Sequence, residues 1–534
     1  MSSYLQIALF MLTVIAAVAV AARRLRAPPS IFLVIAGAVL ALVPGLPRIE
    51  LVPELVLLLV LPPLIYSAGV AMSWREFRYN LRPIGLLAVG CVVFTTCAVA
   101  ASVHWLLGWP WAVGFVLGAI VAPPDVVAPL AIARRLGLPR RLRVILEGEG
   151  LANDATALIL YRFAVSAVST GLFSLGEATG LFTMIVIGEI AYGIGVGWLM
   201  LRLRQAANDP RVEILLSLVT PYAAFWLPSH LGGSGVLATI AAGLYVSWNG
   251  PRLISWATRL QGIFFWDLCI YLIEGFVFLI TGLQARTIIE RASTFQYQEL
   301  LVASLMTVLV IIVARFLWVF PATYLPRWLS PSLARRDPSP KWQFPFILAF
   351  TGIRGVVSLA AALAIPLTTA TGEPFPQREM ILAVTFVVIM VTLIGQGLSL
   401  PFIIRRLGLA DDVAAEREQE HADELTARLE AARAALTRLE QVAEEQNIPP
   451  DVLEDLRAHQ AARLHQLDRA QNRVAISRLA EDVHRVLIDA EREFLHDALR
   501  EGKIRDESRR RLERELDLKE AQLARDSSVE GVGV

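Results

Sequence analysis

The sequence predicts an all-α membrane protein with about thirteen transmembrane helices, followed by a helical cytoplasmic tail. Three observations predict this fold class. Of the 534 residues, 55% are hydrophobic and 18% are charged, whereas a soluble domain carries about a quarter charged residues. Apolar runs long enough to cross roughly 30 Å of hydrocarbon recur along the first three quarters of the chain. The remainder is polar, so we expect a transmembrane domain at 1–410 and a helical tail at 411–534.

Each expected span is a run of roughly 18–25 mainly apolar residues, the length that a helix needs to cross a bilayer. The first run is followed by arginines, and it lacks the small-residue cleavage site of a signal peptide. We therefore expect that it is a retained transmembrane helix. The thirteen expected spans are 4–22, 29–45, 51–72, 84–107, 111–133, 142–169, 176–201, 212–229, 231–248, 260–283, 299–321, 343–367 and 379–404.

The basic residues of the loops predict the orientation. Residues 1–410 hold 29 Lys and Arg side chains, of which 22 fall in loops after odd-numbered spans and four in even-numbered loops. Loops rich in Lys and Arg stay in the cytoplasm, so the odd-numbered loops should be cytoplasmic. This predicts a multi-pass protein of the cell (inner) membrane, with its N-terminus outside and its tail inside.

Two of the expected spans are interrupted. In the fifth span, Pro123, Pro124 and Pro129 surround Asp125, and three prolines in seven residues cannot lie in an intact helix. In the twelfth span, the polar segment 351–355 (Thr-Gly-Ile-Arg-Gly) breaks an apolar run. The two spans cross the membrane in opposite directions, and paired broken helices in two inverted repeats indicate an ion site at the midplane. Two unrelated helix kinks are the alternative.

Charged residues within the spans are a second signal, because each costs about 2.5–3.5 kcal/mol at the bilayer centre and must face protein or water. In the sixth span, Glu149, Asn153 and Thr156 share one helical face, and Asp154 adjoins Asn153. Asp125, Asp154 and Asn153, with carbonyls freed by the break, form an all-oxygen set that suits a hard monovalent cation. It contains no His or Cys, which argues against zinc or copper. Interfacial or ion-pair roles are expected for Glu147, Arg162, Glu189 and Asp267.

The same chemistry predicts how such a site works. Desolvation disfavours the charged form of a buried carboxylate. A cation restores the charged form, whereas a proton removes the attraction for the cation. If only the loaded states switch sides, this competition produces antiport, and Asp154 is the main candidate. The alternatives are an ion channel and a membrane sensor that signals through the tail; without a phosphate loop or a nucleophile constellation, an enzyme is disfavoured.

Residues 115–165 strongly resemble the monovalent cation/proton antiporter-1 family, which includes the bacterial sodium/proton exchangers. The motifs that carry the resemblance are Leu-Glu-Gly-Glu-Gly-Leu-Ala-Asn-Asp at 146–154, Ser-Gly-Val-Leu-Ala-Thr-Ile-Ala-Ala-Gly at 234–243, Gly-Ile-Arg-Gly-Val-Val-Ser-Leu at 352–359 and the tail segment 501–518. The resemblance implies a secondary antiporter without cofactors, in which Na⁺ (or Li⁺ or K⁺) exchanges for H⁺. A K⁺/H⁺ antiporter of the same fold is the alternative. A homodimer with an elevator-like core is also implied.

The resemblance also implies residue roles. Asp154 matches the carboxylate that exchanges ion for proton, and Asp125 matches the acidic residue of the broken helix, so Na⁺ is expected at Asp154 and Asp125. Asn153 matches a partner associated with electroneutral exchange. Glu149 matches a glutamate that pairs with the arginine of the second broken helix, here Arg354.

A further ion pair is expected between Glu274 and Arg315, across the tenth and eleventh spans; the alternative is that Glu274 lines the ion path. Three positions depart from the family pattern, since relatives often have Thr, Ser and Glu where this chain has Pro124, Gly150 and Ser67. Each departure removes a possible oxygen ligand. These three residues, with Glu149 and Thr351, are expected to support the site.

The tail reads as a helical hairpin or small bundle. Leucines recur at near-helical spacing, at 425, 429, 436 and 439, until Pro449-Pro450 ends the run. Two roles remain possible for the tail: a solvated helical appendage, or a module for dimerisation or for regulation of transport. The tail holds 30 acidic and 20 basic side chains and no strand–glycine-loop–helix pattern, so neither nucleic acid nor nucleotide is expected to bind. The expected partners are membrane lipid and a second copy of the chain.

Overall fold

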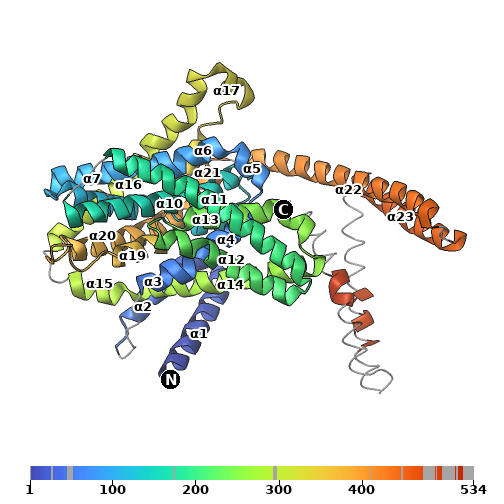
Figure 1. Cartoon of the computed structure of the whole chain (residues 1–534), viewed down its shortest axis with the longest axis horizontal. Helices are drawn as coiled ribbons and strands as arrows, with labels where there is room; N and C mark the ends of the chain where they lie inside the picture. Colours follow the sequence, from blue (N-terminus) through green and yellow to red (C-terminus); the bar gives the residue numbers. More distant parts are fainter. Residues whose placement is uncertain are drawn as a thin grey trace. The chain divides into compact units, whose positions relative to one another are not determined.

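A computed structural model describes residues 2–25, 28–44, 52–171, 175–292, 297–408, 410–446 and 449–472, with short pieces of 487–520. The elements within these ranges are helices, apart from an isolated bridge between Thr368 and Pro374. The prediction of an all-α fold is therefore confirmed. The chain divides into two compact units, Met1–Ala410 and Asp411–Val534, which are described separately (Figure 1).

The first unit contains α1 (Ser2–Leu25), α2 (Pro29–Ala41), α3 (Pro53–Leu55), α4 (Leu61–Ala71), α5 (Trp74–Tyr79), α6 (Leu81–Gly85), α7 (Val92–Leu107), α8 (Trp111–Val121), α9 (Val127–Leu136), α10 (Arg140–Thr170), α11 (Leu175–Ala207), α12 (Pro210–His230), α13 (Val236–Leu253), α14 (Trp256–Leu283), α15 (Ala285–Ala292), α16 (Tyr297–Leu329), α17 (Pro331–Arg336), α18 (Gln343–Phe350), α19 (Val356–Leu363), α20 (Arg378–Val391) and α21 (Gly397–Arg406). Within the described ranges, nine helical stretches are long and apolar enough to cross a membrane, and α2 and α8 are shorter apolar helices. Every expected span falls on a helix or on consecutive helices. The count of thirteen crossings and the inverted repeat stay predictions.

Both expected interruptions are present. The fifth span consists of α8 and α9, and residues 122–126 between them are not helical; the twelfth consists of α18 and α19, separated by 351–355. Pro123 and Pro124 cannot donate the N–H that a continuing helix needs. The two breaks place non-helical backbone inside the helical bundle, where its polar groups need partners from other elements.

Three π-helical segments further distort the spans, at Val56–Val60, Leu86–Cys91 and Thr392–Gln396. In the third span Pro63 has no N–H for the carbonyl of Leu59, and the Tyr222 hydroxyl on α12 donates to that carbonyl at 3.0 Å. In the fourth span Trp318 Nε1 donates to the Leu86 carbonyl at 2.8 Å. In these two segments, a side chain of a neighbouring helix therefore satisfies a backbone carbonyl.

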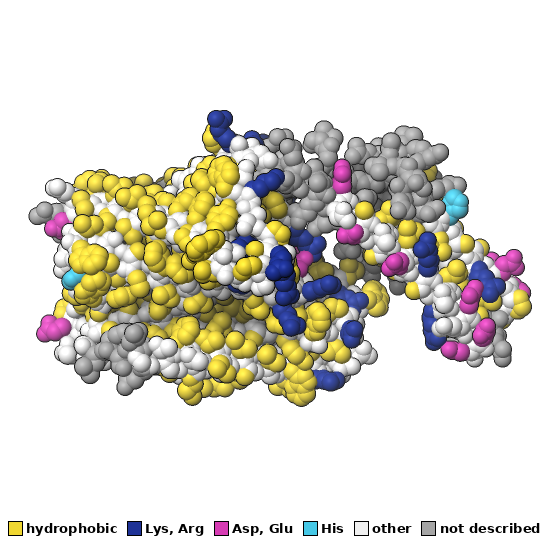
Figure 2. All heavy atoms as spheres, turned by 90° about the horizontal axis from the view of Figure 1, so that it is seen from above, with side chains coloured by type: hydrophobic (Ala, Val, Ile, Leu, Met, Phe, Trp, Pro, Cys, Tyr) yellow, Lys and Arg dark blue, Asp and Glu magenta, His cyan; other side chains and the backbone are white. Residues whose placement is uncertain are grey.

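The surface of the first unit matches a lipid environment. Large apolar side chains lie exposed on many of its helices, including Met184, Phe264 and Trp105 at 73–74%. Hydrophobic side chains cover most of the face in Figure 2, and its Lys and Arg side chains gather toward one end of the bundle. Such a surface is stable in a membrane and would aggregate in water.

Glu189, on α11, caps another helix. Its side chain is buried, and its carboxylate accepts hydrogen bonds from the backbone N–H groups of Ser234 at 2.5 Å, Gly235 at 3.0 Å and Leu237 at 3.1 Å. These N–H groups belong to the start of α13, where a helix leaves its first donors without partners and favours negative charge. The carboxylate of Glu189 therefore serves the N-terminus of α13, and the expected interfacial position of this residue stays a prediction.

At one end of the first unit, called here the arginine-rich end, three arginines meet the carboxylate of Asp337 in the loop between α17 and α18. Arg82 and Arg327 contact Oδ2 at 2.7 and 2.9 Å, and Arg141 contacts Oδ1 at 2.9 Å. The loops after the third, fifth and eleventh spans therefore lie at the same end of the bundle, as the alternation of basic loops requires. Which side of the membrane this end faces stays a prediction.

Burial raises the pKa of Asp337, but hydrogen bonds and charges from Arg141 and Arg327 outweigh this effect and hold the pKa below its usual range. A lowered pKa in the folded state stabilises the protein above the unfolded pKa, and this contribution is lost as pH falls through the folded pKa.

Replacing Asp337 by Asn should therefore destabilise the first unit by about 1–3 kcal/mol at neutral pH, since charge-assisted hydrogen bonds are lost. The difference in Tm between parent and variant should shrink below about pH 4, near the unfolded pKa of an aspartate. Thermal unfolding of the detergent-solubilised protein across this pH range is the measurement. Glu290→Gln, in the exposed Arg286–Glu290 pair, is the control. A difference that is equal in acid and at neutral pH contradicts the prediction.

The tail contains α22 (Ala410–Gln446) and α23 (Pro450–Asn472). The break lies at the predicted prolines, since α23 begins at Pro450. On α22, Leu429 is buried, and the leucines at 425, 436 and 439 are half-buried, as expected for one apolar face. Most of the segment 501–518, which carried the family resemblance in the tail, lies outside the described residues.

Candidate ion-binding site

The two broken helices meet at their breaks. The backbone N–H of Asp125, between α8 and α9, donates to the carbonyl of Ile353, between α18 and α19, at 2.6 Å. The carboxylate of Asp125 turns to its own helix, where Oδ1 accepts a hydrogen bond from the N–H of Val127 at 2.9 Å and so caps the start of α9. The acidic residue of one break is thus fixed directly against the backbone of the other.

Gly355 makes this close approach possible. A Cβ atom at this position would overlap Oδ2, Cγ and Cβ of Asp125. Its backbone has an extended conformation, with φ −130° and ψ −160°, so the need for glycine comes from space and not from a left-handed backbone. Gly355 lies in the motif at 352–359, whose residue types alone indicate no role for it; the missing side chain is what lets the Asp125 carboxylate lie there.

Asn153, on α10, contacts the place where the two breaks, 122–126 and 351–355, meet; this place is called here the crossing. It is fully buried, and its Nδ2 donates to the carbonyl of Pro124 at 2.8 Å. Its Oδ1 is buried without a hydrogen-bond partner among the described residues. The neighbouring carboxylate of Asp154 lies close enough to Asp125 for their charges to interact. The structure therefore brings Asp125, Asn153 and Asp154 together, as the sequence predicts.

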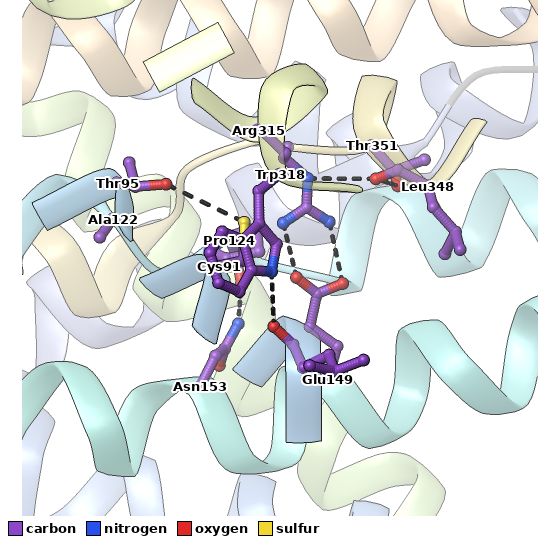
Figure 3. A network of polar contacts seen from close by, with 12 residues as sticks. Cys91, Thr95, Ala122, Pro124, Glu149, Asn153, Arg315, Trp318, Leu348 and Thr351 are labelled. Atoms are coloured by element: carbon purple, nitrogen blue, oxygen red, sulfur yellow. Dashed lines mark hydrogen bonds and ion pairs between the residues drawn. The ribbon is translucent and has the colours of Figure 1, made fainter. Parts of the chain in front are cut away.

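Glu149 is paired with a different arginine from the one expected. Its carboxylate forms a two-pronged ion pair with Arg315 of α16, at 2.5 Å for Oε1–Nη1 and 2.8 Å for Oε2–Nη2, and both side chains are almost fully buried (Figure 3). Arg315 Nε donates to the carbonyl of Leu348 at 3.1 Å. The predicted Glu149–Arg354 pair is wrong, because the guanidinium of Arg315 occupies both carboxylate oxygens.

Arg354 instead serves the backbone of the first break. Its Nε donates to the carbonyl of Val121 at 2.8 Å, its Nη2 to that of Ala122 at 3.3 Å, and its Nη1 to that of Gly352. In a continuous helix the Val121 carbonyl would accept from the N–H of Asp125, which here points to the second break. Arg354 therefore satisfies carbonyls at the end of α8, where a helix favours positive charge.

The predicted Glu274–Arg315 pair is also wrong, because Glu149 and Leu348 occupy Arg315. Glu274, on α14, is half-buried, and the charges of Asp125 and Arg134 act on it. α14 packs against α19 of the second broken helix. The structure thus places a third carboxylate toward the crossing, which favours the alternative that Glu274 lines the path.

The positions that depart from the family pattern differ in their surroundings. Pro124 supplies a backbone carbonyl to Asn153, which needs no side chain. At Gly150 a Cβ would overlap the side chain of Val126, so a valine beside Asp125 fills the space that a serine would need. Ser67 is half-buried on α4, and no hydrogen bond among the described residues connects it with the crossing.

Thr351 opens the second break. It is buried, and its hydroxyl donates to the carbonyl of Leu348 at 3.1 Å, the carbonyl that Arg315 also contacts. Sequence reasoning missed Thr392, whose Oγ1 accepts the backbone N–H of Arg354 at 3.1 Å; a threonine in an apolar helix gives no distinctive signal.

Two interrupted helices, joined at their breaks beside two carboxylates inside an apolar bundle, define an ion-transporting membrane protein. The transmembrane sodium/hydrogen exchanger family matches residues 9–406. The chain is 36% identical to an uncharacterised Na⁺/H⁺ exchanger of Mycobacterium tuberculosis, over 94% of this chain and 92% of that protein. It is 33% identical to a sodium, potassium, lithium and rubidium/H⁺ antiporter of Bacillus pumilus, over 69% of this chain and 56% of that protein.

The fold is similar to that of the sodium/proton antiporter MjNhaP1 of Methanocaldococcus jannaschii, with a TM-score of 0.59 and 18% identity, over 77% of this chain and 100% of that one. The chain belongs to the sodium/hydrogen exchanger family. It is a multi-pass membrane protein that exchanges a monovalent cation for protons, a secondary transporter and not an enzyme. The family expected from the sequence motifs is confirmed.

Replacing Gly355 by Ala should reduce exchange by about 10- to 100-fold, because the added methyl group displaces the Asp125 carboxylate and small misplacements in a site have effects of this size. Gly395→Ala is the matched control, since a Cβ there meets no atom within 4 Å. The measurement is cation-driven proton flux in proteoliposomes that contain equal amounts of folded protein. Equal activity of the two variants contradicts the role given to Gly355.

Proposed function

We propose that the transported cation and the proton compete for Asp154, with Asp125 completing the site. The observation that carries this proposal is a difference between the carboxylates inside the bundle, of which Glu149 is fully buried and Asp125 and Asp154 are half-buried. Arg315 neutralises Glu149, whereas no ion pair with Asp125 or Asp154 is found among the described residues. Two neighbouring carboxylates that lack a basic partner need a cation or a proton, because desolvation and mutual repulsion disfavour their joint ionisation.

Competition at one carboxylate is sufficient for coupling. With the cation bound, Asp154 is ionised and balanced; with the proton bound, it is neutral. The empty, ionised state is the one that desolvation penalises during a change of access. Each transport cycle therefore carries a cation in one direction and a proton in the other.

We further propose electroneutral exchange of one cation for one proton. Asn153 is the uncharged neighbour of Asp154, and its amide is committed to the carbonyl of Pro124. A second titrating carboxylate at that position would offer a second proton. With an amide at position 153, Asp154 is the one residue of the pair that exchanges a proton. Each cycle then moves one positive charge in each direction.

The cation is proposed to be Na⁺, with Li⁺ and K⁺ as the alternatives. The names of two relatives support these alternatives. The name of the Mycobacterium protein gives Na⁺, and the name of the Bacillus protein gives sodium, potassium, lithium and rubidium. Pro124 and Gly150 place no side-chain oxygen at their positions, so backbone carbonyls and the Asn153 Oδ1 are the ligands that complement the two carboxylates.

The assembly proposed is a homodimer in the cell membrane, with the N-terminus outside and the tail in the cytoplasm. The basic loops support this orientation. Residues 1–410 form the exchanger domain and residues 411–534 the cytoplasmic helical tail, for which a role in dimerisation or regulation is proposed.

The deciding experiment uses proteoliposomes with an imposed pH gradient and a fluorescent pH dye. Na⁺ should dissipate the gradient, and parallel additions of Li⁺ and K⁺ define the selectivity. A voltage-sensitive dye in the same vesicles should show no potential during exchange. If none of the three cations dissipates the gradient, the proposal is wrong; a cation current without proton movement would indicate the channel alternative.

A further inference from the structure

A cavity of about 40 Å³ opens at the arginine-rich end. Arg82, Arg141 and Arg327 line it. A water molecule needs roughly 10–15 Å³ measured in this way, so the cavity holds about three waters, the room that a phosphate group takes.

The charges around this cavity are unbalanced. Its three arginines carry +3 and Asp337 carries −1, which leaves +2. Arg327 is only 6% exposed in its side chain, and the Nη1 of Arg82 is buried with no hydrogen-bond partner among the described residues. The excess charge lies on Arg82 and Arg141, which are 29% and 33% exposed, and an anion would supply the acceptor that the unused guanidinium donor of Arg82 lacks.

We propose that this cavity binds a phosphate group, that of an anionic phospholipid headgroup. Arginine presents its N–H groups in a planar fork that matches phosphate oxygens. The three arginines come from α6, α10 and α16, so the site depends on the folded bundle and is not a run of basic residues in one loop. The single carboxylate of Asp337 holds the arginines in place but neutralises only one of them.

A lipid is favoured over a free anion by the rest of the cavity wall. Leu86, Val319 and Phe344 line it beside the arginines, and these apolar side chains suit the glycerol and upper acyl carbons of a phospholipid. The site also lies at an end of a membrane-embedded bundle, where headgroups are concentrated, and basic pockets at the cytoplasmic ends of such bundles attract anionic lipids.

The experiment uses the full-length protein in a neutral detergent, delipidated by washing. Thermal unfolding is measured after addition of phosphatidylglycerol, phosphatidylcholine or inorganic phosphate. Native mass spectrometry of the same samples counts bound lipids. Phosphatidylglycerol should raise the Tm by several degrees and remain bound, and phosphatidylcholine should do neither.

Two variants separate this site from other lipid contacts. Arg82→Gln with Arg141→Gln removes two cavity charges, and Arg335→Gln with Arg336→Gln removes two exposed charges of α17 at the same end. The first pair should lose more than half of the Tm shift, while the second pair should keep it. Because the first pair also loses contacts to Asp337, its Tm without lipid is measured separately, and only the lipid-dependent shift is compared.

Asp337→Asn provides the test in the opposite direction. This substitution lowers the Tm of the lipid-free protein but raises the cavity charge from +2 to +3, so half-maximal binding of phosphatidylglycerol should occur at a several-fold lower concentration. A network that is structural only would lose stability without tighter binding.

The outcomes separate the two sources of phosphate. A larger response to phosphatidylglycerol than to inorganic phosphate, lost in the first variant pair, supports the lipid site. A response to inorganic phosphate alone supports the phosphate site and assigns it to a soluble anion. Equal responses to phosphatidylglycerol and phosphatidylcholine, or an unchanged response in Arg82→Gln with Arg141→Gln, overturn the proposal.

Discussion

Replacing Asp154 by Asn should abolish cation/proton exchange and leave proton flux at the level of protein-free liposomes. The amide has nearly the same size as the carboxylate but can neither bind a proton in this pH range nor balance a cation. Without the exchangeable charge, neither loaded state forms. The measurement is the pH-gradient assay with Na⁺, Li⁺ and K⁺, at saturating cation concentration so that weakened binding is not mistaken for lost transport.

The stability of this variant distinguishes a lost function from a lost fold. Asp154 lies beside Asp125 with no ion pair among the described residues, so neutralising it removes repulsion and desolvation cost. We therefore expect the Tm to be unchanged or higher. Asp267→Asn, at an exposed position on α14, is the matched control and should retain exchange. Transport by Asp154→Asn at the parental rate would refute the assignment.

Breaking the Glu149–Arg315 ion pair should destabilise the protein by about 3–5 kcal/mol, the range for removing one partner of a buried pair. Both Glu149→Gln and Arg315→Met leave a buried charge without its partner. The double variant should cost less than the sum of the two, because no uncompensated charge remains. Thermal unfolding in detergent measures all three, and the Arg286–Glu290 pair, exposed at 38% and 45%, should cost under about 1 kcal/mol when broken.

A second double-mutant cycle, between Glu149 and Arg354, discriminates the observed pairing from the one that the family resemblance implied. Arg354 donates to backbone carbonyls, so its replacement should destabilise the break with little coupling to Glu149. A coupling energy for Glu149 and Arg354 that equals that for Glu149 and Arg315 would contradict the structure.

Sequence reasoning located the helices because apolar run length is a direct consequence of bilayer thickness. It found the first break through its prolines and the second through the polar residues 351–355. It missed short helices such as α5 and α15, which are too short to cross the membrane and carry no long apolar run. It also missed the π-helical segments, which depend on what a neighbouring helix offers, as Tyr222 offers a hydroxyl to Leu59.

In the site, spacing on a single helix predicted Asn153 and Asp154 correctly, because the geometry of one helix fixes which residues are neighbours. Partners on different helices were harder. Glu149 and Arg315 lie 166 positions apart, and nothing in a single sequence specifies the depth and rotation of α10 against α16. The same limitation explains the incorrect pairing of Glu274. It also explains why the role of Gly355 was not predicted, because that role depends on the approach of Asp125 from another broken helix.

The hydrogen bond from Asp125 to Ile353 has a consequence for the thermodynamics of the transporter. It connects two segments that are far apart in the sequence, so a core that moves between two sides of the membrane would carry the crossing as one rigid body. The ion would then experience the same ligands whichever way the site opens, and its intrinsic affinity would be equal at both faces. Ligand binding in such a carrier favours neither face, so the imposed gradients alone set the direction of net exchange.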